Sequence, residues 1–194
     1  MVNIRSESPK WTFIFIGICT LVFIIQQFTV SWIYFAFFPK YALIMPWTFV
    51  TSIFLHADIS HLMLNMFALF FFGLALESTI GRKRFALLFI ISGVVGNVGY
   101  YLTAIDPAVP AIGSSGAVYG IIGALTAITP FRIVWIYGIL PIPLIAAVAL
   151  WVLIDLTGLF LPTGIAHGAH LGGILVGILY GLYFRAKLRK RYYW

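Results

Sequence analysis

The chain has 194 residues, of which 62% are hydrophobic and only 9% are charged, and its mean hydropathy is +1.06. A soluble domain of this size needs many more charged residues on its surface, so this composition excludes a soluble globular protein and indicates an integral membrane protein. The formal net charge is +7, but the basic residues lie at the ends of apolar segments and in a carboxyl-terminal tail. That pattern favours contact with a lipid bilayer over binding of nucleic acid.

Six apolar segments have nearly the length that crosses a hydrocarbon core of about 30 Å, and their hydrophobicity is continuous rather than alternating. We therefore predict an all-α polytopic membrane protein whose residues 1–194 form a single membrane domain with a six-span core over about 11–184. The spans are expected at Trp11–Ile33, Ile59–Leu76, Phe85–Thr103, Ser115–Ile128, Ile133–Leu156 with Pro141 and Pro143 inside it, and Ala166–Phe184.

Basic residues are distributed unevenly between the two sides of such a bundle. With a cytoplasmic amino end, eleven of the twelve basic residues lie inside and only Lys40 lies outside. The positive-inside rule therefore predicts a multi-pass protein of the cell membrane with both termini in the cytoplasm. The inside group comprises Arg5, Lys10, Arg82, Lys83, Arg84, Arg132, Arg185, Lys187, Arg189, Lys190 and Arg191.

The stretch from Tyr34 to Asp58 is the one long connection. It is rich in aromatic residues, and Pro39 and Pro46 interrupt it, so its longest candidate helix, Tyr41 to Leu55, is too short to cross. We expect a membrane-associated loop at the outer interface, where Trp and Tyr are favoured.

Polar side chains inside predicted spans are costly and indicate function. Counted at about 1.5 Å per residue from the nearest cytoplasmic basic residues, Ser115 and Asn65 lie about 26 Å and His170 about 22 Å above them. Three spans thus bring polar groups to one layer below the outer surface. The full set of such residues is His61, Asn65, Asn97, Ser115, His167 and His170.

Ser115 lies in Gly113-Ser114-Ser115-Gly116 at the start of a short apolar helix. A hydroxyl there is a candidate nucleophile, and the free N–H groups and positive dipole of the helix end suit an anionic tetrahedral intermediate. His170 is the candidate base. His61 and Asn65, spaced i and i+4, share a helix face from which both can donate to the same oxyanion.

Two further features concern how the base is held. Tyr119 follows Ser115 by one helical turn and is placed to stack on the imidazole of His170. No acid that would orient His170 is apparent, because Asp155 is expected near the outer end of the fifth span. A two-residue Ser-His arrangement is therefore predicted.

Structural interpretations compete with the catalytic one. Ser and Gly in membrane helices often serve close packing, and His or Asn often bridges helices. His56 and His167 are expected at the interface or in support of the site. A zinc site from His56 and His61 would have poor spacing and no third ligand, so no metal or other cofactor is predicted. Cys19 is the single cysteine, which excludes an internal disulfide.

These residues resemble the rhomboid family of intramembrane serine proteases, of the prokaryotic six-span type. Four motifs of that family occur in the same chain order here. His61-x-x-x-Asn65 is similar to the family's oxyanion pair, and Glu77-x-x-x-Gly81-x-x-x-Phe85 is similar to the stretch after the second span. Gly113-x-Ser115-x is similar to the nucleophile motif, and Ala169-His170-x-Gly-Gly to the base motif. One departure is Trp47-Thr48, where the family usually carries Trp-Arg.

The resemblance implies a serine endopeptidase that needs no cofactor and cleaves transmembrane segments of other membrane proteins near the outer face. It assigns Ser115 as nucleophile, His170 as base, His61, Asn65 and the Ser115 amide to the oxyanion, and Tyr119, Gly113 and Gly116 to supporting roles. Two other classes stay open: a non-catalytic rhomboid-like membrane chaperone that binds client proteins, and a proton-coupled transporter. The transporter would require a carboxylate in the core, and the predicted spans place no acidic residue at mid-membrane, which counts against this class.

Overall fold

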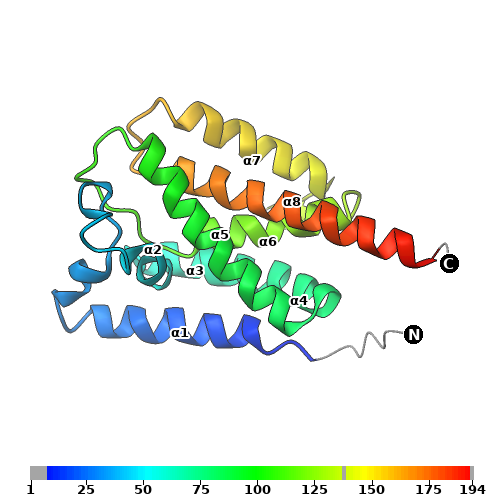
Figure 1. The fold of residues 1–194 in the computed structure, drawn as a ribbon, viewed down its shortest axis with the longest axis horizontal. Coiled ribbons are helices and arrows are strands. Elements are labelled where there is room, and N and C mark those ends of the chain that lie inside the picture. The colour runs from blue at the N-terminus through cyan, green and yellow to red at the C-terminus, as the bar shows by residue number, and fades with distance from the viewer. Residues whose placement is uncertain (1–7, 137–138, 193–194) are drawn as a thin grey trace.

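A computed structural model describes residues 8–136 and 139–192 as a mostly helical bundle (Figure 1), in agreement with the predicted all-α class. Helix α3 continues through a π-helical segment, η4, into α4, and together they form one long rod. The principal helices are α1 (Trp11–Gln26), α3 (Ile59–Ala68), η4 (Leu69–Gly73), α4 (Leu74–Ile80), α5 (Arg82–Thr103), α6 (Ser115–Ile128), α7 (Leu144–Gly158) and α8 (His167–Tyr192).

Several of these helices have the length and apolarity of membrane spans. Within the described residues, three stretches suffice by themselves: Ile59–Ile80, Arg82–Thr103 and His167–Leu188. Trp11–Gln26, Ser115–Ile128 and Leu144–Gly158 are apolar but shorter. Large apolar side chains such as Leu64, Leu87 and Leu175 point outward, which suits a surface that faces lipid.

Glycines bring α6 and α8 together at backbone distance. A Cβ atom at Gly173 would lie 1.9 Å from the carbonyl oxygen of Gly116, and one at Gly177 would lie 2.0 Å from that of Gly120. Only hydrogen fits at these crossings, as in other small-residue interfaces of membrane helices. The second contact lies four residues further along both helices than the first, so α6 and α8 run parallel and begin at the same end of the bundle. This arrangement puts Ser115 and His170 at one level.

The first predicted span, Trp11–Ile33, is longer than the helix. Helix α1 ends at Gln26, whose amide accepts a hydrogen bond from the backbone N–H of His56 and donates one to its carbonyl, both at 3.1 Å. These contacts pair Gln26 with the outer loop, and the chain leaves the helix there.

The fifth predicted span, Ile133–Leu156, is wrong in its first half. Strand β1 (Ile133–Ile136) pairs antiparallel with β2 (Leu140–Pro143) in a short hairpin, and helix α7 starts only at Leu144. The physical reason is proline, which lacks the N–H that a helix interior needs. Pro141 and Pro143 both lie in β2, and Pro143 directly precedes the helix.

The outer loop between α1 and α3 consists of short turns rather than one interrupted helix. They are η1 (Ser31–Phe35), η2 (Pro39–Tyr41), α2 (Thr48–Thr51) and η3 (Ser52–Phe54). Phe37 and Ala111 exchange backbone hydrogen bonds of 3.2 and 2.8 Å, and the N–H of Gly113 donates to the carbonyl of Ser52 at 3.0 Å. The outer loop therefore holds the segment that leads into Ser115.

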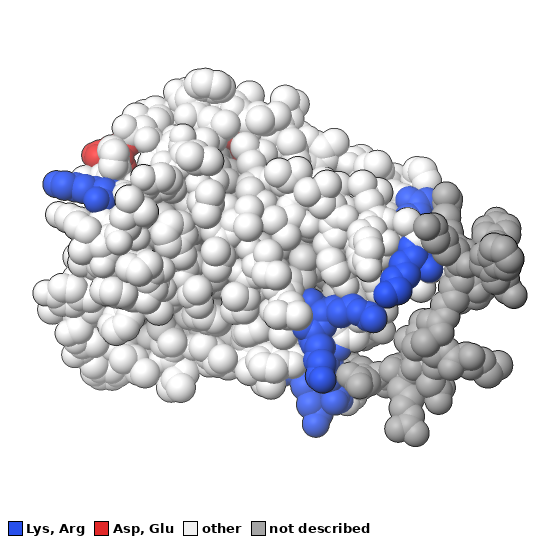
Figure 2. Space-filling model, in the orientation of Figure 1, with Lys and Arg blue, Asp and Glu red and all other residues white. Residues whose placement is uncertain are grey.

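Charged side chains lie at the two ends of the bundle. Figure 1 places both chain termini at one end, and Figure 2 shows most of the visible Lys and Arg side chains gathered at that same end. Helix α1 is fixed there by Glu77 of α4, whose carboxylate accepts hydrogen bonds of 2.9 Å from the N–H groups of Lys10, Trp11 and Thr12.

Candidate active site

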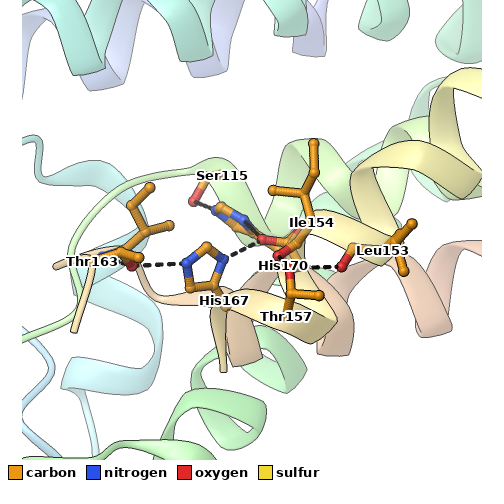
Figure 3. Close-up of polar contacts among 9 residues, drawn as sticks. Ser115, Leu153, Ile154, Thr157, Thr163, His167 and His170 are labelled. Atoms are coloured by element: carbon orange, nitrogen blue, oxygen red, sulfur yellow. Dashed lines mark hydrogen bonds and ion pairs between the residues drawn. The ribbon is translucent and has the colours of Figure 1, made fainter. Parts of the chain in front are cut away.

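Ser115 and His170 meet where α6 and α8 begin. Ser115 is the first residue of α6, and His170 lies in the first turn of α8. The Nε2 atom of His170 is 3.0 Å from the hydroxyl oxygen of Ser115 (Figure 3), within hydrogen-bonding distance. This contact is the geometry that a hydroxyl nucleophile and its base require.

Asp155 of α7 completes a chain of polar contacts that the sequence did not predict. Its Oδ1 atom lies 2.9 Å from Nδ1 of His170 and 2.6 Å from Nδ1 of His167. Asp155 is only 2% exposed. The expectation that no acid orients His170 is therefore wrong. The sequence argument against a transporter, that no carboxylate lies in the core, falls with it.

Hydrogen bonding fixes where the imidazole protons lie. An ionised carboxylate only accepts, so each histidine that faces Asp155 carries its proton on Nδ1. The Nε2 atom of His170 is then free to accept the Ser115 hydroxyl proton. By the same logic, Nε2 of His167 accepts from the hydroxyl of Thr163, which lies 2.8 Å away (Figure 3).

Tyr119 packs on the face of the His170 ring. The two ring centroids are 4.2 Å apart and the planes differ by 11°. A parallel contact of this kind restricts rotation of the imidazole. With Asp155 at one nitrogen and Tyr119 on the face, both the tautomer and the plane of His170 are fixed.

His61 lies beside the turn that precedes Ser115. Gly113 has φ +121°, and a Cβ atom there would lie 2.6 Å from Cε1 of His61, so the imidazole occupies the space that only glycine leaves. Asp58 caps α3 by accepting from the His61 N–H at 2.8 Å. Hydrogen bonds from the Ser60 hydroxyl and the His61 N–H lower the pKa of Asp58, so this cap is ionised at neutral pH.

The other predicted residues lie close by in different settings. Asn65 is buried, and its amide nitrogen donates to the His61 carbonyl at 2.9 Å, within its own helix. Gly116 packs against α8, since a Cβ there would lie 3.2 Å from the carbonyl oxygen of Ala169. Asn97 donates to the Phe49 carbonyl and the Ser52 hydroxyl, so it bridges α5 to the outer loop.

His56 and His167, expected at the interface or in support, are both buried. His56 lies in the outer loop, and its Nε2 atom is 3.4 Å from the hydroxyl of Ser114. Burial lowers the pKa of His56 to about 4, so this ring is neutral at physiological pH. His167 contacts Asp155, as described above, and belongs to the one group of three potential metal ligands in the described part of the chain: Asp155, His167 and His170.

Sequence reasoning missed Asp155 because its position depends on how α7 packs against α8. A signal was nevertheless present. Asp155 is the only acidic residue after Asp106, and a carboxylate within an apolar helix needs a partner. The nearest titratable groups in the sequence are His167 and His170, at the start of the next helix.

Comparison with known proteins shows which family and which relatives this chain is similar to. The family model described as "Rhomboid domain" matches residues 44–187. YdcA of Bacillus subtilis (strain 168), named as a candidate rhomboid protease, is 34% identical over 146 residues, which cover 75% of this chain and 71% of that protein.

Two other relatives are longer than the chain. Mitochondrial Rhomboid protein 1 of Saccharomyces cerevisiae is 29% identical over 205 residues, covering 96% of this chain and 57% of the yeast protein. Rhomboid protease GluP of Bacillus subtilis is 30% identical over 129 residues, covering 62% of this chain and 25% of GluP. The match therefore spans about half of the yeast protein and a quarter of GluP.

Proposed function

Because the chain belongs to the rhomboid family, whose members are multi-pass membrane proteins, we propose that it is an intramembrane serine endopeptidase with Ser115 and His170 as its catalytic pair. The observation that carries the proposal is the 3.0 Å contact between the Ser115 hydroxyl and Nε2 of His170. Relatives named rhomboid proteases support the same class of reaction.

In the proposed mechanism, His170 takes the hydroxyl proton through Nε2 as the Ser115 oxygen attacks the scissile carbonyl, and later gives that proton to the leaving amine. Asp155 acts as a positioning residue, because its carboxylate keeps the other proton of His170 on Nδ1. No metal or organic cofactor takes part in this scheme.

The developing oxyanion needs hydrogen-bond donors. The backbone N–H of Ser115 at the start of α6 is one, and the imidazole of His61 against Gly113 is the second. Asn65 is a third, since its amide nitrogen carries two hydrogens and gives only one of them to the His61 carbonyl. One such donor is typically worth about 2.7 to 4 kcal/mol in the transition state.

We also propose the finer topology: one membrane domain with six spans, in the cell membrane, with both termini in the cytoplasm. The gathering of basic side chains at the end that carries both termini supports this orientation. Substrates are then single transmembrane segments cut near the outer face. A helical peptide bond is internally hydrogen-bonded, so a substrate helix must open locally before Ser115 attacks.

A fluorophosphonate probe tests the assignment. Purified protein in detergent should be labelled covalently and should cleave a model transmembrane substrate, whereas Ser115→Ala and His170→Ala should lose both properties and keep their folding. Ser114→Ala is the matched control, because Ser114 is the neighbouring hydroxyl and contacts His56 rather than His170. Cleavage by Ser115→Ala at the wild-type rate would refute the proposal.

The same experiment separates the alternatives. A client-binding chaperone would bind the transmembrane segment without cutting it and would resist the probe. A proton-coupled transporter would depend on Asp155, His167 and His170 but not on the Ser115 hydroxyl.

A further inference from the structure

Asp155 holds two imidazoles, although a serine nucleophile needs only one base. His167 contacts the same Oδ1 atom as His170, but its Nε2 atom faces Thr163 rather than Ser115. The nitrogen and oxygen atoms that Asp155, His167 and His170 offer all lie within 4.8 Å of one another. The proposed mechanism does not use His167.

We propose that Asp155, His167 and His170 form an inhibitory site for a divalent transition metal ion, and that Zn²⁺ fits it well. Two imidazole nitrogens and one carboxylate oxygen are donors that Zn²⁺ prefers, and three protein ligands leave a fourth position for water. His167 and His170 are spaced i and i+3 on α8, and Asp155 comes from the neighbouring helix α7. Helix bundles build metal sites from this combination of one i, i+3 pair and ligands on facing helices.

Two features of the surroundings point to a ligand. The second oxygen of Asp155, Oδ2, is buried and forms no close hydrogen bond among the described residues. Besides the two histidines, the Tyr119 hydroxyl approaches the carboxylate, so Oδ2 can bind the metal without breaking the contact with either histidine. His167 and Thr163 also line a cavity of about 290 Å³ between the loops that follow α5 and α7. The cavity has room for water on the His167 side of the cluster, whereas Asp155 and His170 do not line it.

Metal binding would invert the tautomer that catalysis needs. An ion bound to Nδ1 of His170 requires a lone pair there, so the ring proton moves to Nε2, relayed by water. The Nε2–H group then donates to the Ser115 hydroxyl and can no longer accept its proton. The same shift in His167 turns its contact with Thr163 around. Each hydroxyl can donate or accept, and no proton is gained or lost overall with Asp155 ionised.

A binding measurement tests the site without relying on proteolysis. Full-length Ser115→Ala protein in detergent is titrated with Zn²⁺ by calorimetry and with Co²⁺ by visible absorption. We expect one Zn²⁺ per chain and the strong visible bands of tetrahedral Co²⁺. Replacing a ligand, as in His167→Gln or Asp155→Asn in the same background, should weaken Zn²⁺ binding by roughly 100-fold. This is the upper end of the loss seen when residues that only hydrogen-bond to metal ligands are replaced.

His56→Gln is the matched control, because it removes a different buried histidine that lies outside the cluster. It should leave Zn²⁺ binding intact. The inference would be overturned if Ser115→Ala bound no stoichiometric Zn²⁺. It would also be overturned if adding His167→Gln or Asp155→Asn left the Zn²⁺ affinity of Ser115→Ala unchanged.

Inhibition is then measured as the ratio of cleavage rates with and without Zn²⁺ for each variant. Wild-type protein should be inhibited and should recover with EDTA, whereas His167→Gln should resist the metal at concentrations that saturate the wild type. The inhibitory role rests on the proposed protease function, but the two fail separately. If wild-type protein bound Zn²⁺ but cleaved no substrate, the proposed protease function would be refuted. If cleavage were unaffected by bound Zn²⁺, the inhibitory role alone would be refuted.

Discussion

At the scale of single residues, the contact between Asp155 and His170 decides which nitrogen of the base is free. Asp155→Asn replaces an acceptor with a group that can donate to Nδ1 and so favours the wrong tautomer. We expect kcat to fall by roughly 100-fold, the range of general acid–base contributions, with little change in KM. Steady-state cleavage of a model transmembrane substrate measures this.

Asp106→Asn is the control, because Asp106 is exposed in the loop before Ser115 and accepts a hydrogen bond from Ala108. It should retain wild-type kinetics. An Asp155→Asn enzyme with unchanged kcat would show that the carboxylate does not position the base.

Gly113 is a second residue whose identity is dictated locally. Gly113→Ala would introduce strain at φ +121° and push the His61 ring away, so we expect both lower stability, by roughly 1 to 3 kcal/mol, and lower kcat. Gly81→Ala separates the two effects. Gly81 has φ +84° with open space around its Cβ position, so its substitution should reduce stability alone.

Thermal unfolding in detergent and cleavage rates distinguish the two glycine variants. If Gly113→Ala lost stability but kept full activity, His61 would not depend on Gly113 for its place near the oxyanion.

At the scale of helices, the parallel crossing of α6 and α8 sets the distance between nucleophile and base. Gly173→Ala places a methyl group against the Gly116 carbonyl, so the helices must separate. We expect a loss of roughly 1 to 3 kcal/mol in unfolding free energy, with activity falling further because Ser115 and His170 move apart.

Gly17→Ala in α1 is the opposite case. Its Cβ would meet nothing within 4 Å, so the substitution should be neutral or stabilise by up to about 1 kcal/mol through helix propensity. Denaturation of both variants in mixed detergent micelles gives the comparison. Equal stabilities would mean that the crossing tolerates extra volume.

Glu77 of α4 holds the start of α1 in place at the other end of the bundle. Its buried carboxylate accepts three backbone N–H bonds and the Thr12 hydroxyl. Glu77→Gln removes the charge that strengthens them, so we expect a loss of roughly 1.5 to 3 kcal/mol in stability with kcat retained. Thermal unfolding and cleavage kinetics measure these two properties. A Glu77→Gln variant that unfolds at the wild-type temperature would show that the contacts of Glu77 with α1 contribute little to stability.

Much of this element structure could be predicted because continuous hydrophobicity marks helices directly. Helix α6 has the predicted bounds, Ser115–Ile128, and α5 ends at the predicted Thr103. Where prediction failed, local chemistry competed with hydrophobicity: Pro141 and Pro143 turned an apolar stretch into a strand.

Within the site, motif and depth arguments identified Ser115, His170 and Tyr119, whose side chains the structure brings together. Asp155 could not be placed in this way. Its contacts depend on packing between α7 and α8, which periodicity and spacing within one segment do not contain.

At the scale of the whole molecule, charge is distributed along the bundle axis. Lys10 and Arg82 lie where α1 and α5 begin, Arg185 lies in the carboxyl-terminal part of α8, and Lys40 lies in η2 of the outer loop. From the positive-inside rule we expect this arrangement to orient the bundle with its termini in the cytoplasm and the loops around Ser115 outside.

Cysteine labelling in cells tests that orientation. Cys19 is the only cysteine and is buried, so Cys19→Ala gives a background without reactive thiols. In it, Lys40→Cys should react with a membrane-impermeant maleimide in intact cells, whereas Lys187→Cys should react only after the membrane is opened. The exposed positions of both residues make either thiol accessible once the reagent reaches its side. The reverse pattern would place the candidate active site toward the cytoplasm, and substrates would then have to be cut near that face.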